Sequence, residues 1–257
     1  MDAFFAAVEV LENPDLAGKP VVVGGRPEER GVVAAASYPA RAFGVRSAIP
    51  MARALRLCPQ AVILPPRHDA YRTYSRRVMA ILRETSLLVE QMSVDEAYLD
   101  LTDQVDEWEE AVEIARRLQA RVRDEIGLSS SLGVATNKLV AKVASDRDKP
   151  GGLTVVQPGE EAAFLAPLPV RVLWGVGPVT AQKLAEMGAA TVGELARVGE
   201  EGLIARFGRH GAEMARQARG VDERPVTTEH ERKSISQETT FSSDLRSVDA
   251  LKRQLWR

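Results

Sequence analysis

The residues with the clearest potential for chemistry are the adjacent carboxylates Asp95 and Glu96. Apolar segments flank them, so they are predicted to lie at the end of a hairpin in a buried sheet. Two carboxylates held together there repel unless a cation lies between them, and Mg²⁺ prefers such oxygen ligands and usually keeps substrate phosphates in its shell. Paired Mg²⁺ ions can hold the attacking and leaving oxygens of an in-line phosphoryl transfer. The simpler interpretation is a solvated acidic turn.

A second candidate is the glycine turn Gly175-Val176-Gly177, which has helix-compatible sequence on both sides. Glycines in such a turn let backbone amides come near an anion. Thr180 and Lys183 follow on the next predicted helix, where they can add phosphate contacts. A plain connection between two helices has the same pattern, so the turn by itself does not decide between the two interpretations.

Five further side chains are candidates for contacts with a nucleotide. Tyr38 and Arg41 stand at the predicted start of a helix, and Lys149 precedes a Pro-Gly-Gly turn, so each could meet a triphosphate. Phe4 and Phe5 lie in an apolar N-terminal segment that we predict to be a strand, and by default they are core residues.

Composition limits the class of protein. The chain has 257 residues, of which 45% are hydrophobic and 27% charged, as expected for a globular protein. No apolar run reaches the ~20 residues of a membrane-spanning helix and no signal peptide is recognisable, so we expect a cytoplasmic protein with no membrane partner. One cysteine and three histidines exclude an internal disulfide and a zinc-type cluster, so any metal must be held by oxygen. The net charge of −2 gives no overall attraction to nucleic acid, so DNA binding would depend on local arginine clusters.

The elements that must position these residues alternate between strands and helices. Ser37 is predicted to cap the helix that holds Tyr38 and Arg41. The predicted strands are 21–23, 32–36, 87–92, 97–101, 130–134 and 153–156. The other predicted helices are 50–57, 69–82, 114–126 and a capped helix over 136–145. This order predicts an α+β fold that resembles a ferredoxin-like arrangement, with residues 11–67 inserted after the first strand.

The sequence changes character after Pro158. Short helical segments separated by glycines predict a separate small helical domain. Residues 226–232 are polar without an apolar period and are predicted to be a linker. Residues 234–257 begin a new segment, but about 25 residues cannot build a stable core alone. We therefore expect the chain to stop inside a domain.

Four segments with natural intervals between them carry a resemblance to a known family. They are Met1–Glu9, Tyr38–Val45, Ser93–Asp100 and Lys149–Gly152. Together they closely resemble a Y-family DNA polymerase of the DinB, or DNA polymerase IV, type, and the resemblance covers residues 1 to about 245. It implies a DNA-directed DNA polymerase, a nucleotidyltransferase that joins a dNTP to primer-template DNA. The implied domains are a palm (1–10 and 68–156), inserted fingers (11–67), a helix-hairpin-helix thumb (157–229) and a linker with the truncated start of a little finger (230–257).

The resemblance also implies a role for each candidate residue. Asp95 and Glu96 would bind two Mg²⁺ ions and carry catalysis, and the backbone carbonyl of Met1 would add a metal ligand. Phe5 would be the steric gate, an aromatic ring that clashes with a ribose 2′-hydroxyl, and Phe4 would stack beside it. The implied contacts to the triphosphate are Tyr38, Arg41 and Lys149, and those to the DNA backbone are Gly175, Gly177, Thr180 and Lys183.

The N-terminus departs from the family pattern. In the family an aspartate stands immediately before the residue that matches Met1, and it is the third metal ligand. Asp2 matches a different aspartate and is not expected to bind metal. Ala35 stands where relatives often have a hydroxyl group that contacts phosphate. We expect a fragment or a misassigned start, and very low activity from residues 1–257 as they stand.

The resemblance implies translesion synthesis in DNA repair, because the family combines a roomy site with small fingers. No segment resembles a proofreading nuclease. A sliding clamp would bind through a tail beyond Arg257, and we expect a monomer. One alternative is a non-catalytic DNA-binding or scaffold relative that uses the helix-hairpin-helix alone. Another is a nucleotide cyclase, which can hold acidic metal ligands on a similar sheet, but Phe4, Phe5 and the glycine turn have no purpose there.

Overall fold

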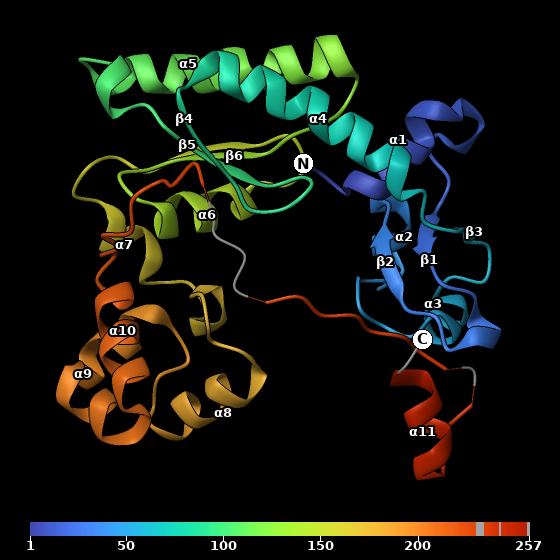
Figure 1. Ribbon diagram of the computed structural model, residues 1–257. Helices are drawn as coiled ribbons and strands as arrows, with labels where there is room; N and C mark the ends of the chain where they lie inside the picture. Colours follow the sequence, from blue (N-terminus) through green and yellow to red (C-terminus); the bar gives the residue numbers. More distant parts are fainter. Residues whose placement is uncertain (230–233, 242, 256–257) are drawn as a thin grey trace. The chain divides into compact units, whose positions relative to one another are not determined.

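The computed structural model describes residues 1–229, 234–241 and 243–255 (Figure 1). They form two compact units, which we describe separately. The first consists of Met1–Asp2 and Arg77–Glu229, and the second of Ala3–Arg76 and His230–Arg257. Residues 230–233, which belong to the predicted linker and little finger, lie outside the described residues. Among the helices of the described ranges, none is long and apolar enough to cross a membrane.

Two two-stranded sheets form the α/β part of the first unit. β4 (Leu88–Gln91) and β5 (Ala97–Asp100) pair antiparallel as the predicted hairpin, and β6 (Leu132–Val134) and β7 (Leu153–Val155) pair in parallel. Figure 1 shows α5 (Trp108–Arg121) on one side of these strands and α6 (Lys138–Arg147) on the other. The hairpin therefore presents its turn, which holds the acidic pair, at one end of the strands.

The helices around these strands follow the predicted patterns. The end of α4 (His68–Thr85) lies in the first unit, where Glu84 pairs with Arg121 of α5 at 2.9 Å. The buried residues of α5 recur every three or four positions, which gives the helix one apolar face. A π-helical turn follows α5, and this helical segment ends at Gly127. The φ of Gly127 is 82°, which lies in the left-handed region that glycine adopts without strain.

Helix α6 (Lys138–Arg147) positions several polar residues of the site and begins later than predicted. Its cap is Asn137, whose side-chain oxygen accepts from the amide of Val140 at 3.0 Å. Thr136, the predicted first residue, instead donates to Glu161 at 2.6 Å. Gly133 on β6 allows close packing of α6, because a Cβ there would lie 2.1 Å from the carbonyl oxygen of Ala141.

The C-terminal part of the first unit is helical, as predicted. Its helices are α7 (Glu161–Leu165), α8 (Pro178–Glu186), α9 (Val192–Phe207) and α10 (Arg209–Ala218). Their apolar core includes Leu184, Leu203 and Met214, each fully buried, together with Leu139 and Val140 of α6. The helical segment thus shares one apolar core with α6.

The second unit is built on a three-stranded sheet in the order β2-β1-β3. β1 (Val21–Gly24) is the buried central strand, antiparallel to β2 (Val33–Ala36) and parallel to β3 (Val62–Leu64). Ser37 caps the next helix as predicted, accepting from the Ala40 amide at 3.5 Å. The helices of this unit are α1 (Phe4–Glu12), α2 (Tyr38–Ala42), α3 (Met51–Leu57), α11 (Val248–Leu255) and the first part of α4.

The predicted N-terminal strand is wrong, because Phe4–Glu12 form the helix α1. The segment consists mainly of residues with good helix propensity, and only its two valines are β-branched. Phe4, Ala6 and Val8 are buried against the rest of the unit, and α1 packs on β1 and β2. Phe4 and Phe5 are therefore the first two residues of a helix.

Candidate active site

The acidic pair lies in the turn between β4 and β5, and a serine shapes that turn. The hydroxyl of Ser93 donates to Asp95 Oδ1 at 2.9 Å and accepts from the amides of Asp95 and Glu96 at 3.2 and 3.1 Å. The amides of Met92 and Ser93 both donate to the carbonyl of Glu96, at 2.9 and 3.2 Å. These bonds fix the backbone that carries the carboxylates before any ligand binds.

The N-terminus is joined to the same turn. The ammonium of Met1 donates to the carbonyl oxygen of Asp95 at 2.8 Å. Burial lowers the pKa of this ammonium, although the negative charge of Asp95 acts in the opposite direction. The first residue is therefore held against the backbone of the acidic turn.

Asp2 has a different environment from Asp95 and Glu96. Its carboxylate is buried and accepts hydrogen bonds from Ser129, Ser131 and the amide of Gly151, at 2.7, 2.8 and 2.9 Å. Both carboxylate oxygens are engaged by these donors. This geometry suits a residue that anchors the N-terminus to the loops beside β6 and β7.

A row of alternating charges runs from Glu96 along α6. Lys142 Nζ lies 2.7 Å from Glu96 and 3.3 Å from Asp146, and Lys149 Nζ lies 2.6 Å from the other oxygen of Asp146. Burial acts to lower the pKa of Lys142, but its two acidic partners outweigh this and the pKa is raised. Burial acts to raise the pKa of Asp146, but Lys149 and Lys142 together lower it. Lys142 and Asp146 are therefore both held in their charged forms.

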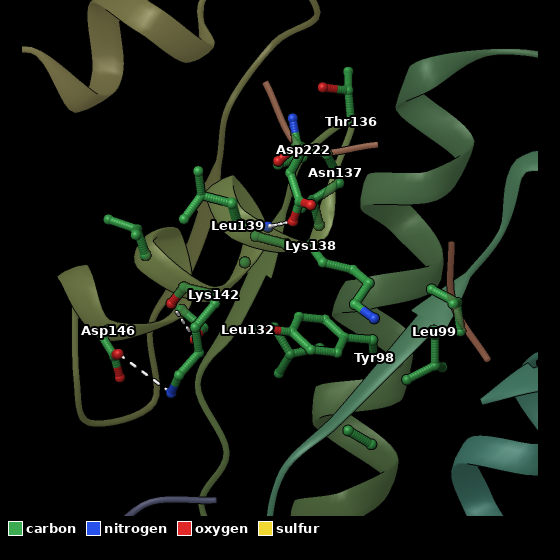
Figure 2. Close-up of a pocket in the computed structure, with 18 of the residues that line it drawn as sticks. Tyr98, Leu99, Leu132, Thr136, Asn137, Lys138, Leu139, Lys142, Asp146 and Asp222 are labelled. Atoms are coloured by element: carbon green, nitrogen blue, oxygen red, sulfur yellow. Dashed lines mark hydrogen bonds and ion pairs between the residues drawn. The ribbon is translucent and has the colours of Figure 1, made fainter. Parts of the chain in front are cut away.

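A cleft of about 1690 Å³ in the first unit is lined by most of the predicted site residues of that unit, namely Met1, Asp95, Glu96, Lys149, Gly175 and Gly177. Thr180 and Lys183 are not among its lining residues. Figure 2 shows Lys142 and Asp146 of α6 joined by an ion pair in this cleft, with Tyr98 of β5 nearby. It also shows the Asp222 carboxylate accepting a hydrogen bond from the amide of Leu139. The carboxylate pair, the predicted triphosphate lysine and the glycine turn thus face one space.

The glycine turn precedes α8, as predicted. Gly175 has a φ of 86° and Gly177 is the N-cap of α8. A Cβ on Gly175 would lie 3.0 Å from His210 Nε2, so this position favours glycine both in conformation and in space. Thr180 and Lys183 lie on α8, and Lys183 is exposed. The helical element before the turn is only one short turn, Val170–Val172.

The segment after α10 lines the cleft and contacts the residue that precedes the glycine turn. The guanidinium of Arg224 lies 4.6 Å from the ring centre of Trp174, the residue before Gly175. Arg224 also bonds both oxygens of Asp222, at 2.7 and 2.8 Å. Asp222 in turn accepts from the amide of Leu139, at the start of α6, at 3.0 Å. The turn is therefore connected to the helix that carries Lys142.

The remaining predicted site residues lie in the second unit. Phe5 stacks on Tyr71 with ring centres 4.0 Å apart and an interplanar angle of 10°, and Phe4 lies 5.9 Å from Phe5. The hydroxyl of Tyr71 donates to Glu9 at 2.6 Å. Burial is the larger cause and this hydrogen bond the second cause that raise the pKa of Tyr71 to about 12. The two phenylalanines therefore belong to an aromatic cluster that a buried carboxylate supports.

Tyr38 and Arg41 are neighbours on α2. The guanidinium of Arg41 lies 4.8 Å from the ring centre of Tyr38, and its Nε donates to the carbonyl of Ala36 at 2.9 Å. Ala35, the position where a hydroxyl was expected in relatives, lies on β2 and is 8% exposed. The pair is thus oriented by the end of β2 and by the first turn of α2.

The structure brings some predicted residues together and adds others that the sequence did not single out. Asp95, Glu96 and Lys149 share the cleft of the first unit, whereas Phe4, Phe5, Tyr38 and Arg41 belong to the second unit. Ser93, Lys142 and Asp146 were missed. Lys142 and Asp146 stand four residues apart on a helix, which is also the spacing of an ordinary surface ion pair, so this spacing alone does not indicate a functional site.

The donor set of the acidic turn fits a hard divalent cation. Two adjacent carboxylates open to a cleft match the way Mg²⁺ is held by one or two carboxylates together with water and phosphate. Within the residues that the structure describes, no group of three or more acidic, histidine or cysteine side chains is placed to hold a metal ion. A cation at this turn would therefore rely on Asp95 and Glu96.

Comparison with known proteins agrees with this geometry. Residues 1–146 match the model of the impB/mucB/samB family, and residues 158–189 match the helix-hairpin-helix motif of the same family. The chain is 48% identical over 254 residues to a DNA polymerase IV of Ralstonia nicotianae, covering 99% of this chain and 71% of that protein. It is 50% identical over 245 residues to a DNA polymerase IV of Alkalilimnicola ehrlichii, covering 95% and 69%.

Solved structures show the same fold. DinB from Sulfolobus solfataricus matches with a TM-score of 0.82 and 34% identity, over 88% of this chain and 67% of that one. An insertion ternary complex of Dbh DNA polymerase matches with a TM-score of 0.81 and 34% identity, over the same shares of the two chains. The mixed α/β architecture with a helix-hairpin-helix, expected for palm, fingers and thumb, is thereby confirmed.

The fold and the relatives of the chain are those of a DNA-directed DNA polymerase. The chain belongs to the impB/mucB/samB family, the Y-family DNA polymerases.

Proposed function

We propose that this chain carries out template-directed DNA synthesis, in which the 3′-hydroxyl of a primer attacks the α-phosphate of a dNTP and pyrophosphate leaves. The observation that carries this proposal is the shared cleft of Asp95, Glu96 and Lys149. Carboxylates for a divalent cation and an ammonium for a polyphosphate are the parts that nucleotidyl transfer needs. That a relative was solved as an insertion ternary complex supports the binding of DNA and a dNTP.

Asp95 and Glu96 would hold two Mg²⁺ ions, and the backbone carbonyl of Met1 would add a ligand. Such ions supply charge stabilisation for the oxygens that are made and broken in phosphoryl transfer. The contribution of the chain itself is the orientation of the two carboxylates. The three hydrogen bonds around the Ser93 hydroxyl support this role, because they fix the turn independently of ligands.

The incoming nucleotide would be held through its phosphates and tested through its sugar. Lys149, Tyr38 and Arg41 would contact the triphosphate, because their donors suit phosphate oxygens. Phe5 would be the steric gate against ribose, with Phe4 stacked beside it. The stack of Phe5 on Tyr71 supports this role, since a ring that is held rigidly excludes a hydroxyl better than a mobile one.

Primer-template DNA would be gripped by the glycine turn without reading of its sequence. Gly175 and Gly177 would bring backbone amides to phosphates, and Thr180 and Lys183 would add side-chain contacts. The left-handed φ of Gly175 and the exposure of Lys183 support this role. The corresponding domains are the palm at 1–10 and 68–156, fingers at 11–67, thumb at 157–229 and the start of a little finger at 230–257.

We further propose that residues 1–257 alone have low activity and that an aspartate placed immediately before Met1 raises it. The site offers two carboxylates, and the cationic Met1 terminus lies 2.8 Å from the Asp95 carbonyl. A third carboxylate in that place would add a ligand for a cation, and loss of such a group costs about 100-fold or more in rate. Translesion synthesis is the cellular role that we propose, while clamp binding, a monomeric state and a cytoplasmic location stay predictions.

The proposal is tested by single-nucleotide addition to a primer-template, with Mg²⁺, by the chain that carries the added aspartate. Asp95→Asn and Glu96→Gln should each reduce the rate by about 100-fold or more, with DNA affinity measured in parallel. Full Mg²⁺-dependent activity of both variants would contradict the assignment. DNA binding without any incorporation by the unmutated site would instead favour the non-catalytic relative that uses the helix-hairpin-helix alone.

A further inference from the structure

Lys142 stands between two carboxylates that belong to different elements. Its ammonium is 2.7 Å from Glu96 of the β4–β5 turn and 3.3 Å from Asp146 on its own helix. The sequence separation of Lys142 and Glu96 is 46 residues, so this contact depends on the fold. The Lys142 ammonium thus forms ion pairs with two carboxylates, and it lies nearer to Glu96, the candidate metal ligand.

Asp146 in turn is shared by two ammonium groups. Its Oδ2 faces Lys142 and its Oδ1 lies 2.6 Å from Lys149, the candidate triphosphate ligand. The four side chains are between 27% and 49% exposed, so the pairs are partly shielded from water yet open to the cleft. The charges alternate in the order Glu96, Lys142, Asp146, Lys149.

This order gives the row a defined response to a cation at Glu96. A divalent ion there repels the Lys142 ammonium, and Asp146 is already within reach of that ammonium by side-chain movement alone. When the Lys142 ammonium moves closer to Asp146, it neutralises more of the charge of that carboxylate. The ion pair between Asp146 and Lys149 is then weaker. The backbone need not move, because α6 carries both Lys142 and Asp146 and is fixed at its start by the Asn137 cap.

We propose that Lys142 and Asp146 are positioning residues that couple binding of a divalent cation at Glu96 to release of Lys149 for a nucleoside triphosphate. This inference rests on the proposed function, because it assumes that Glu96 is a metal ligand and that Lys149 contacts phosphate. The coupling is reciprocal, so nucleotide on Lys149 also strengthens cation binding at Glu96.

The two residues should have opposite effects when either is neutralised. Lys142→Met removes the competitor at Glu96 and leaves Asp146 to Lys149 alone, so cation binding tightens and nucleotide binding weakens. Asp146→Asn removes the alternative partner of Lys142 and frees Lys149, so cation binding weakens and nucleotide binding tightens. We expect each change to be about twofold to fivefold, the range for partly exposed ion pairs.

The experiment measures Mn²⁺ affinity by electron paramagnetic resonance without nucleotide and again with a saturating non-hydrolysable dNTP analogue, and the ratio of the two affinities gives the coupling. Affinity for the analogue is measured by calorimetry at saturating Mn²⁺. Both use the full chain with primer-template. Lys252→Met on α11 is the charge-matched control and should change neither affinity. In Lys142→Met combined with Asp146→Asn, cation and nucleotide binding should be less strongly coupled than in the unmutated chain, even though the net charge is the same.

The outcomes separate this inference from the proposed function. Opposite shifts in the two single variants, with reduced coupling in the double variant, support it. Unchanged affinities, shifts in the same direction, or a double variant with full coupling overturn it. If the Glu96→Gln single variant binds Mn²⁺ as tightly as the unmutated chain does, the proposed metal site is wrong and the inference fails with it.

Discussion

Lys138 of α6 donates to Glu90 of β4 at 2.5 Å, and the two side chains are only 9% and 4% exposed. Lys138 also donates to the carbonyl of Pro225 at 3.1 Å, and the amide of Thr227 donates to Glu90 at 3.0 Å. This buried pair joins the strand that leads to the acidic turn, the helix that carries Lys142 and the segment that follows α10. The positions of the carboxylates relative to α6 therefore depend on it.

Replacing Lys138 with methionine should lower the free energy of unfolding by about 3 kcal/mol, because it leaves the Glu90 carboxylate buried without its cation. Urea denaturation followed by tryptophan fluorescence measures this change. Lys138→Met combined with Glu90→Leu should recover most of the loss, since both charges are then absent. A single variant as stable as the unmutated protein would show that the pair does not hold these elements together.

The Tyr71 hydroxyl should make stability depend on alkaline pH. Its pKa is raised from 10.0 to about 12, so between these values the folded chain keeps a proton that the unfolded chain loses. The contribution is fully present below pH 10 and is lost as pH rises towards 12, so the free energy of unfolding falls over this window. Chemical denaturation at pH 9 and pH 11 should show a smaller fall in Tyr71→Phe, and an equal fall would contradict the assignment.

Gly175→Ala should weaken binding of primer-template DNA. The change forces a side chain into a φ of 86° and 3.0 Å from His210 Nε2, and it should cost about 1 kcal/mol of stability. Gly188→Ala is the matched control, because Gly188 has a φ of 78° but no atom within 4 Å of an added Cβ. DNA affinity measured by fluorescence anisotropy should fall only in Gly175→Ala, and equal affinities would remove the glycine turn from the DNA-binding surface.

Phe5→Ala should reduce the preference for dNTPs over rNTPs by about tenfold or more, because the ring that blocks a 2′-hydroxyl is lost. Single-turnover incorporation of matched dNTP and rNTP measures it, with an aspartate added before Met1 in every variant. Phe43→Ala is the control, since Phe43 lies in the same unit and is 46% exposed. Unchanged discrimination in Phe5→Ala would refute the steric gate.

Much of the fold follows from local patterns in the sequence. The three- and four-residue spacing of Tyr71, Tyr74, Val78 and Ile81 predicted α4, and the breakers around Val21–Val23 predicted β1. The error at α1 arose because a short apolar segment fits a strand and a buried helix alike. The start of α6 was predicted at Thr136, two residues too early, because threonine and asparagine are both common at helix starts.

The acidic pair and the glycine turn were found from sequence because they occur in short contiguous motifs. Lys142 could not be found in this way, since what distinguishes it is a contact with Glu96 across 46 residues. Asp146 could not be found either, because it is distinguished by its contacts with Lys142 and Lys149. The roles of Asp2 and Glu9 were hidden for a similar reason. Their importance comes from burial and from distant donors, Ser131 for Asp2 and Tyr71 for Glu9.

The central claim is tested most directly by locating a cation and a nucleotide together. A crystal of the chain with primer-template, Mn²⁺ and a non-hydrolysable dNTP analogue would give anomalous scattering from the metal. We predict anomalous density at the carboxylates of Asp95 and Glu96, with the triphosphate in contact with Lys149. Density for the metal at other residues, or a nucleotide bound away from these carboxylates, would contradict the account.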